Sequence, residues 1–211
     1  MFMRCLLAAG LALLLGGCVG WVAETRLIPV DERDTPGLMG LYVGDEGLSA
    51  LIAPGDEGFL RFSDPDGGGS SDVAFDLLRE EPPRPALFAA EAVEDENAAP
   101  IVPDRSFLVE FPVEGDEGKT AYAYGIVRVS GGQPAETFQH YSVLCSKAAE
   151  ALAARREDRF CIFDDYARLR AAALDALAWQ DDARLAVDSN DFTLKSEADP
   201  MEADAAEDAG P

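Results

Sequence analysis

Apolar and polar residues alternate with a period of two through much of the chain between residues 38 and 130. In residues 106–114 every second residue is Phe or Val, and residues 121–130 carry small residues on one face and larger ones on the other. A strand with one buried face has this period. We therefore predict strands at 38–43, 48–53, 59–62, 73–78, 86–93, 106–114 and 121–130.

Glycine-rich turns separate several of these strands. The tetrapeptide Gly-Asp-Glu-Gly occurs at 44–47, 55–58 and 115–118. Glycine accepts positive φ and Asp bonds to its own backbone, so each tetrapeptide predicts a hairpin turn. Strands spaced by about ten residues favour an antiparallel meander that can roll into a barrel.

Acidic loops raise calcium as an alternative, but the turn interpretation is stronger. Each Gly-Asp-Glu-Gly turn offers only two carboxylates. The loop that begins at Asp64 has acidic residues at ligand-like spacing, yet Phe75 stands at the twelfth position, where a calcium loop needs a bidentate Glu. We predict no metal site.

The pattern becomes helical after residue 145. Residues 146–157 have helical composition, and Asp164 or Asp165 can cap a second helix that runs to residue 179. The predicted fold class is α+β: an antiparallel β-meander or barrel-like sheet followed by a two-helix, disulfide-tied C-terminal segment. Shorter elements are predicted at 137–141 (a strand or the start of a helix), 184–187 and 192–195 (strands).

The N-terminus has the features of an export signal. One positive charge at Arg4 precedes the apolar run 5–15, and small residues follow. The sequence Leu15-Gly16-Gly17-Cys18 resembles the lipobox of bacterial lipoproteins. The resemblance implies cleavage before Cys18, a diacylglycerol thioether on its sulfur, and a fatty acyl group such as palmitate on its amino group.

The same resemblance predicts where the protein resides. Val19, rather than Asp, follows the cysteine, which implies a lipid anchor in the outer membrane with the body facing the periplasm. The alternative is an uncleaved membrane helix over 5–23, a charge-free run just long enough to span a bilayer but weakened as a helix by four glycines.

Two of the four cysteines remain once Cys5 leaves with the signal and Cys18 takes lipid. Cys145 and Cys161 form an even pair in an oxidising compartment, and we predict a disulfide between them. The alternative is a catalytic or redox thiol, although redox pairs usually stand closer in sequence.

These features divide the chain into four parts. The expected parts are a signal peptide (1–17), a lipidated tether (18–37), a single β-rich domain with C-terminal helices (38–195) and a disordered acidic tail (196–211). Lys and Arg number 17 against 40 Asp and Glu, for a net charge of −23. This charge excludes a nucleic-acid binder and argues against a domain that lies on anionic lipid through its own surface.

Catalytic motifs are missing from the sequence. A Ser-His-Asp or Cys-His site would have to use His140, the one histidine, and no nucleophile motif, phosphate loop or dinucleotide fingerprint accompanies it. We predict no enzyme and no cofactor, but an envelope lipoprotein that docks with another envelope protein. A lipocalin-like carrier of an apolar ligand is the alternative, and an enzyme ranks third. A cavity of several hundred Å³ favours the carrier, and an exposed apolar patch favours docking.

Overall fold

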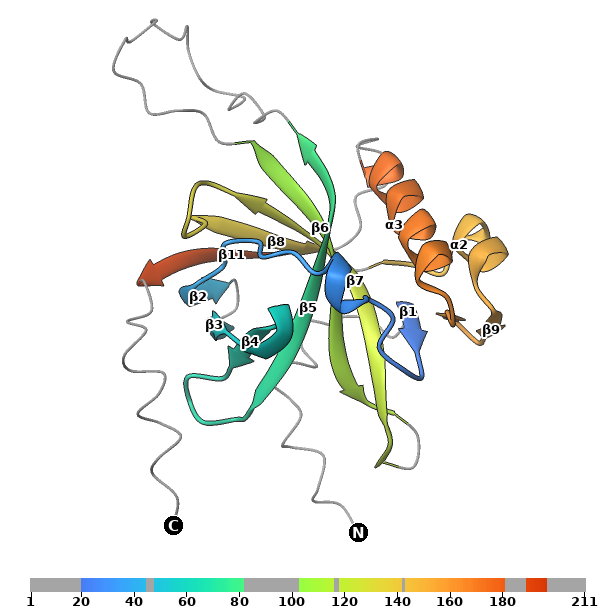
Figure 1. The fold of residues 1–211 in the computed structure, drawn as a ribbon, viewed down its shortest axis with the longest axis horizontal. Coiled ribbons are helices and arrows are strands. Elements are labelled where there is room, and N and C mark those ends of the chain that lie inside the picture. The colour runs from blue at the N-terminus through green and yellow to red at the C-terminus, as the bar shows by residue number, and fades with distance from the viewer. Residues whose placement is uncertain are drawn as a thin grey trace, which may run out of the picture.

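The computed structural model describes residues 20–44, 48–81, 103–115, 118–141, 143–180 and 189–196. In this part of the chain, strands dominate, and eight of them close into an antiparallel barrel with two α-helices on one side (Figure 1). The signal peptide, Cys18, the strands expected at 86–93 and 184–187, and the acidic tail after Ser196 lie outside the described residues.

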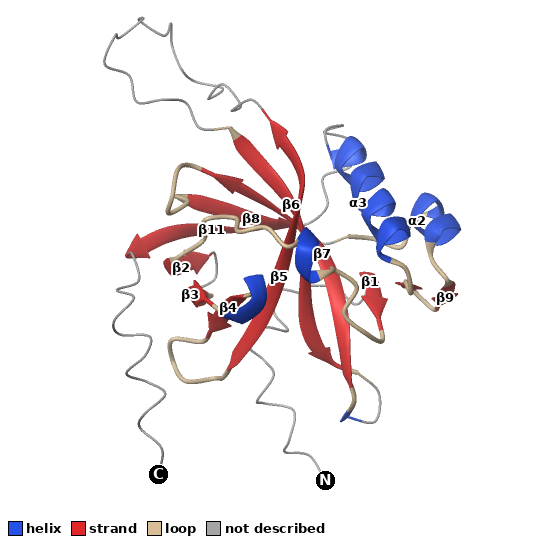
Figure 2. Cartoon of the chain, in the orientation of Figure 1, coloured by secondary structure: helices blue, strands red, loops and turns tan. Residues whose placement is uncertain are grey.

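The barrel strands follow one another around the barrel in chain order, each antiparallel to the next, and the last pairs with the first (Figure 2). The expected meander is thus confirmed, and it closes. Its strands are β2 (Gly40–Gly44), β3 (Ser49–Pro54), β4 (Leu60–Ser63), β5 (Ser70–Glu81), β6 (Asp104–Glu114), β7 (Thr120–Ser130), β8 (Thr137–Tyr141) and β11 (Ser189–Ser196).

Three short strands extend from the barrel at β7. The second half of β7 pairs with β8, whereas its first half pairs with β1 (Gly20–Ala23). β1 is parallel to β10 (Phe160–Ile162), which in turn is antiparallel to β9 (Arg155–Glu157). The described chain also contains the 3-10 turns η2 (Val30–Glu32) and η4 (Asp56–Gly58).

The period-two alternation places one set of side chains inside the barrel. Phe107, Val109 and Phe111 of β6 belong to the interior core, while Leu108 faces the outer core. On β7 the small-residue face points inward and the tyrosines point outward. Pro112 lies beyond the last residue of β6 that pairs with β5, so its missing N–H leaves no gap in that ladder.

A second core lies between the outer barrel wall and the helices α2 (Lys147–Leu152) and α3 (Tyr166–Gln180). Asp165 caps α3 as one of the two expected residues, since it accepts a hydrogen bond from the N–H of Arg168, and Ser146 caps α2 by accepting one from the N–H of Ala149. The apolar face of α3 contains Leu169 and Leu177, which are fully buried. No helix in the described part of the chain is long and apolar enough to cross a membrane.

Three predictions need correction. The tether expected over 18–37 is wrong from Gly20 onward, because Trp21 and Ile28 are buried in the outer core. The first helix stops at Leu152, because residues 155–157 pair with β10 instead of continuing it. The helical segment is also not C-terminal to the sheet: the chain returns afterwards to add β11.

Candidate functional site

The barrel interior contains a small apolar cavity of about 30 Å³. A volume of this size holds one or two water molecules, far less than the several hundred Å³ of a typical ligand pocket. Among the described residues, the barrel is therefore nearly filled by its own side chains. The cavity is lined by Leu38, Phe62, Val73, Phe75, Val109, Phe111, Val127, Phe138 and His140.

His140 is the polar side chain among these lining residues. It lies on β8, is 4% exposed, and neither ring nitrogen has a hydrogen-bond partner among the described residues. Its ring stands edge-on to Phe111, with 6.1 Å between ring centres. Gly125 on β7 makes room for it, since a Cβ there would lie 2.6 Å from Nε2.

Burial lowers the pKa of His140 to about 4, because charging the imidazole in this apolar setting is unfavourable. The ring is neutral near pH 7, with one nitrogen able to donate and the other able to accept. A buried water needs two to four polar partners, and this lining offers one side chain. A molecule with one polar atom on an apolar body matches the lining better than water does.

The sequence-based alternative of a Cys-His site is excluded by the disulfide. Cys145 and Cys161 are bonded, with an S–S distance of 2.00 Å and Cα atoms 5.2 Å apart, as predicted. Neither sulfur is available as a nucleophile, and His140 faces the opposite, interior side of the barrel wall from the core that contains Cys161.

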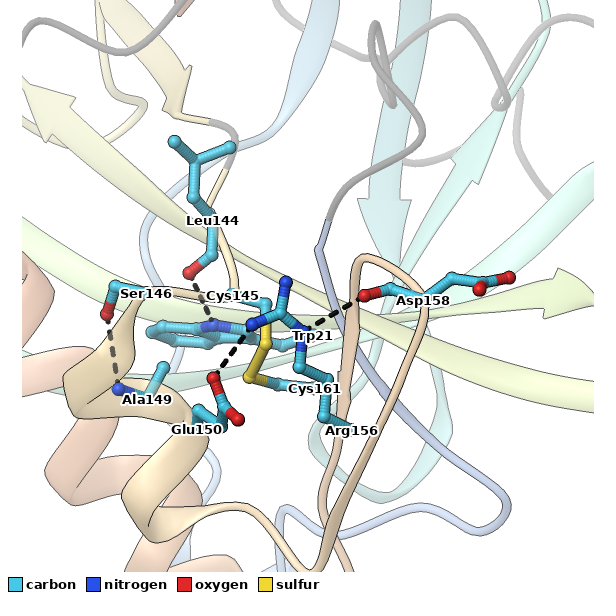
Figure 3. The surroundings of a disulfide bond; sticks show 9 residues. All are labelled: Trp21, Leu144, Cys145, Ser146, Ala149, Glu150, Arg156, Asp158 and Cys161. Atoms are coloured by element: carbon cyan, nitrogen blue, oxygen red, sulfur yellow. Dashed lines mark hydrogen bonds and ion pairs between the residues drawn. A yellow bond between two sulfur atoms is a disulfide. The ribbon is translucent and has the colours of Figure 1, made fainter.

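The disulfide is part of a compact unit beside β1, which we call the disulfide segment (residues 143–163). Figure 3 shows Trp21 next to the disulfide, with its indole N–H donating to the carbonyl of Leu144 at 3.0 Å. The Arg156 guanidinium bridges to the Glu150 carboxylate at 2.8 Å and donates to the Asp158 carbonyl (Figure 3). The disulfide thus ties the two ends of the segment together, while the Trp21 hydrogen bond and the pairing of β10 with β1 hold the segment against the first strand of the described chain.

A fully buried carboxylate, Glu110 on β6, holds the chain that follows β1. Its Oε2 accepts hydrogen bonds from the N–H of Leu27 (2.7 Å), the N–H of Ile28 (3.1 Å) and the hydroxyl of Tyr124 (2.9 Å). Its Oε1 accepts one from Arg26 at 3.1 Å. Burial, and then the Glu110 charge, raise the pKa of Tyr124, so the phenol remains a donor. The role of this cluster is structural.

A second buried carboxylate attaches α3 to the barrel. Asp76 on β5 accepts hydrogen bonds from the Tyr166 hydroxyl (2.8 Å) and the Arg170 guanidinium (3.1 Å). Burial raises the pKa of Asp76, opposed by these two partners. Sequence reasoning missed both buried carboxylates, because each occupies a position that alternation alone assigns to the outer face of a strand.

The acidic turns have the hydrogen bonds of hairpins. The first glycine of each Gly-Asp-Glu-Gly donates its N–H to the carbonyl four residues on, at 2.7–2.9 Å. In the loop at Asp64, the carboxylate accepts from the N–H of Asp66 and the backbone closes between Asp64 and Gly69. No group of three or more potential metal ligands gathers among the described residues.

Comparison with protein-family models, with curated proteins and with solved structures found no match. The barrel interior, the outer surface of the described residues and the lipobox resemblance at Cys18 are therefore the features that bear on function.

Proposed function

We propose that this protein is a lipid-anchored, periplasm-facing envelope protein that acts by docking its outer surface to another protein. The observation that carries the proposal is the nearly filled barrel. A cavity of about 30 Å³ is too small for the apolar molecules that lipocalin-like carriers enclose. Binding then falls to the outside of the barrel and to the elements packed on it.

The described residues support a non-catalytic role. The one imidazole, His140, is enclosed by apolar side chains and lies beside no acid or nucleophile among the cavity-lining residues. General acid–base catalysis needs such a group within hydrogen-bond reach of a substrate. The net charge of −23 favours a partner with a basic face, which it would attract over a long range.

Membrane attachment rests on the lipobox. Two or more acyl chains at Cys18 would make anchoring durable, since each buried methylene contributes about 0.8 kcal/mol. We expect mature wild-type protein to fractionate with membranes and to carry the acyl mass, whereas Cys18→Ser gives a soluble protein or an uncleaved precursor. Membrane attachment of Cys18→Ser equal to that of wild type would contradict the lipid assignment.

Docking is tested by photo-crosslinking in intact cells from single exposed positions. Val30 and Leu174 are large apolar side chains that are 59% and 40% exposed, and Asp66 on an exposed hairpin provides the control. We expect a discrete adduct from at least one apolar position, containing the same second protein in repeated preparations, and none from Asp66. Adducts that are absent everywhere, or identical at all three positions, refute docking through these sites.

A second candidate, uptake of a small molecule into the barrel, is favoured by one observation: His140 has no partner in an apolar cavity. Its ligand would carry a single hydroxyl or carbonyl. Because His140 is the one histidine, its ring nitrogens are assignable by NMR without ambiguity. Titration with methanol and ethanol should shift these signals saturably, and signals that stay unchanged with both alcohols rule this candidate out.

A further inference from the structure

The chain between the proposed lipid and the first strand is very short. Cys18 is two residues from Gly20, the first residue of β1. An extended chain covers at most about 3.6 Å per residue, so the Cα atom of Cys18 is within about 7 Å of the Cα atom of Gly20. The lipid therefore determines which part of the body is next to the bilayer.

The neighbour of that attachment point is the disulfide segment. β1 and β10 are parallel, with Gly20 opposite Phe160. The N-terminal end of β1 is consequently at the same end as the turn that precedes Phe160, which contains Asp158 and Arg159. Both residues of this turn are exposed.

Leu144 brings an apolar side chain to the same region. Its side chain is 50% exposed, and its carbonyl accepts the indole N–H of Trp21, the residue after Gly20. The backbone carbonyl of Val143 lies 3.7 Å from where a Cβ of Gly20 would be. An exposed Leu at a membrane surface can bury its side chain among the lipid headgroups and upper acyl chains.

The charge of the disulfide segment also differs from that of the chain. Residues 143–163 contain four basic residues and three acidic ones, a net charge of +1, while the whole chain carries −23. An anionic bilayer would repel the rest of the body and would not repel this segment. Lys147 and Arg159 are exposed on it.

From these observations we propose that the disulfide segment is the membrane-contacting surface, with Leu144 and the Asp158–Arg159 turn against a phospholipid bilayer. The inference rests on the lipid anchor of the proposed function. It adds an orientation: β9, β10 and the start of β1 face the lipid, and the β4–β5 hairpin on the other side of the barrel points away (Figure 1).

The test uses the full mature lipidated chain in vesicles of zwitterionic lipid with about one third anionic phospholipid. A fluorophore is attached at Arg159→Cys or, as the matched exposed control, at Asp66→Cys on the β4–β5 hairpin. Headgroup-labelled lipid acts as the quencher. We expect strong quenching at position 159 and little at position 66.

A charge variant separates orientation from anchoring. Lys147→Gln alone, which removes one positive charge, should leave flotation with vesicles intact, because the lipid anchors the protein. On anionic vesicles the ratio of quenching at position 159 to quenching at position 66 should fall by about fivefold, the factor expected for one basic residue near such a surface. On neutral vesicles the same ratio should change less.

The outcomes separate the inference from the proposal beneath it. Flotation with equal quenching at the two positions overturns the orientation and leaves the anchor standing. Protein that does not float and lacks the acyl mass overturns the anchor, and the orientation with it. Quenching that favours position 66 assigns the opposite face to the membrane and refutes the inference directly.

Discussion

Glu110 offers the sharpest test of how the N-terminal segment is held to the barrel. Its carboxylate is fully buried and accepts four hydrogen bonds, from Arg26, Leu27, Ile28 and Tyr124. Glu110→Ala removes all four acceptor contacts at once. The N–H of Ile28 and the phenol hydroxyl then lose their acceptor in a site with little access to water, while the N–H of Leu27 keeps its bond to the Tyr124 oxygen at 3.2 Å.

The magnitude follows from these contacts. A buried donor left unpaired costs about 1–3 kcal/mol, and removal of one partner of a buried ion pair costs about 3–5 kcal/mol. The Arg26 side chain is 27% exposed and can turn toward water, which limits its share. We expect Glu110→Ala to lower the free energy of unfolding by about 3–5 kcal/mol. Tyr124→Phe removes one of the four bonds to Glu110, together with the longer bond from the N–H of Leu27, which still has Glu110, and should lower the free energy of unfolding by about 1 kcal/mol.

Urea unfolding of the oxidised mature chain measures both variants, with an unchanged slope against urea as the check that the transition remains comparable. Hydrogen exchange adds a local reading, because residues 20–28 should lose protection in Glu110→Ala before the barrel strands do. If Glu110→Ala loses no more stability than Tyr124→Phe, the carboxylate does not hold this segment and the reasoning fails.

Three further predictions concern the barrel core and the disulfide. Because the folded-state pKa of His140 is lowered to about 4 from 6.5, the unfolded chain binds more protons between these values. Stability should therefore fall by roughly 3 kcal/mol as the pH drops from 7 to 4, and pH-dependent unfolding of His140→Leu should lack that part of the loss. Phe111→Ala, beside the cavity, should destabilise by about 3–5 kcal/mol in the same urea assay, and a change under 1 kcal/mol would show that the core collapses around the gap. Replacing Cys145 and Cys161 together by Ser should cost about 3 kcal/mol, read from thermal midpoints with wild type as control, and unaltered midpoints would contradict it.

Much of the barrel could be predicted because its strands obey a local rule. The alternation in residues 106–114 and 121–130 assigns faces to β6 and β7 correctly, and the cap at Asp165 marks the start of α3. The disulfide followed from an even count of cysteines behind an export signal.

The missed features depend on contacts between distant parts of the chain. Arg26 and Glu110 are 84 residues apart, and nothing near either residue indicates that they meet. For the same reason the segment after Cys18 was expected to be a tether: its prolines and charges are typical of a linker, while the carboxylate that holds it belongs to β6. The inward position of His140 likewise depends on barrel closure, which joins strands that are distant in sequence.

The order in which the barrel closes constrains how this chain folds. β11 pairs with both β2 and β8, so the ring is incomplete until the last described strand arrives, after the two helices. Until then β2 and β8 are free edges, with unpaired N–H and carbonyl groups that could pair with another molecule. Closure also pairs β2 with β11, which are about 150 residues apart in sequence. Such long-range pairing forms slowly because a long loop must close first. A chain truncated before Ser189 is therefore expected to be caught as an open, aggregation-prone sheet, even though it retains both helices and the disulfide.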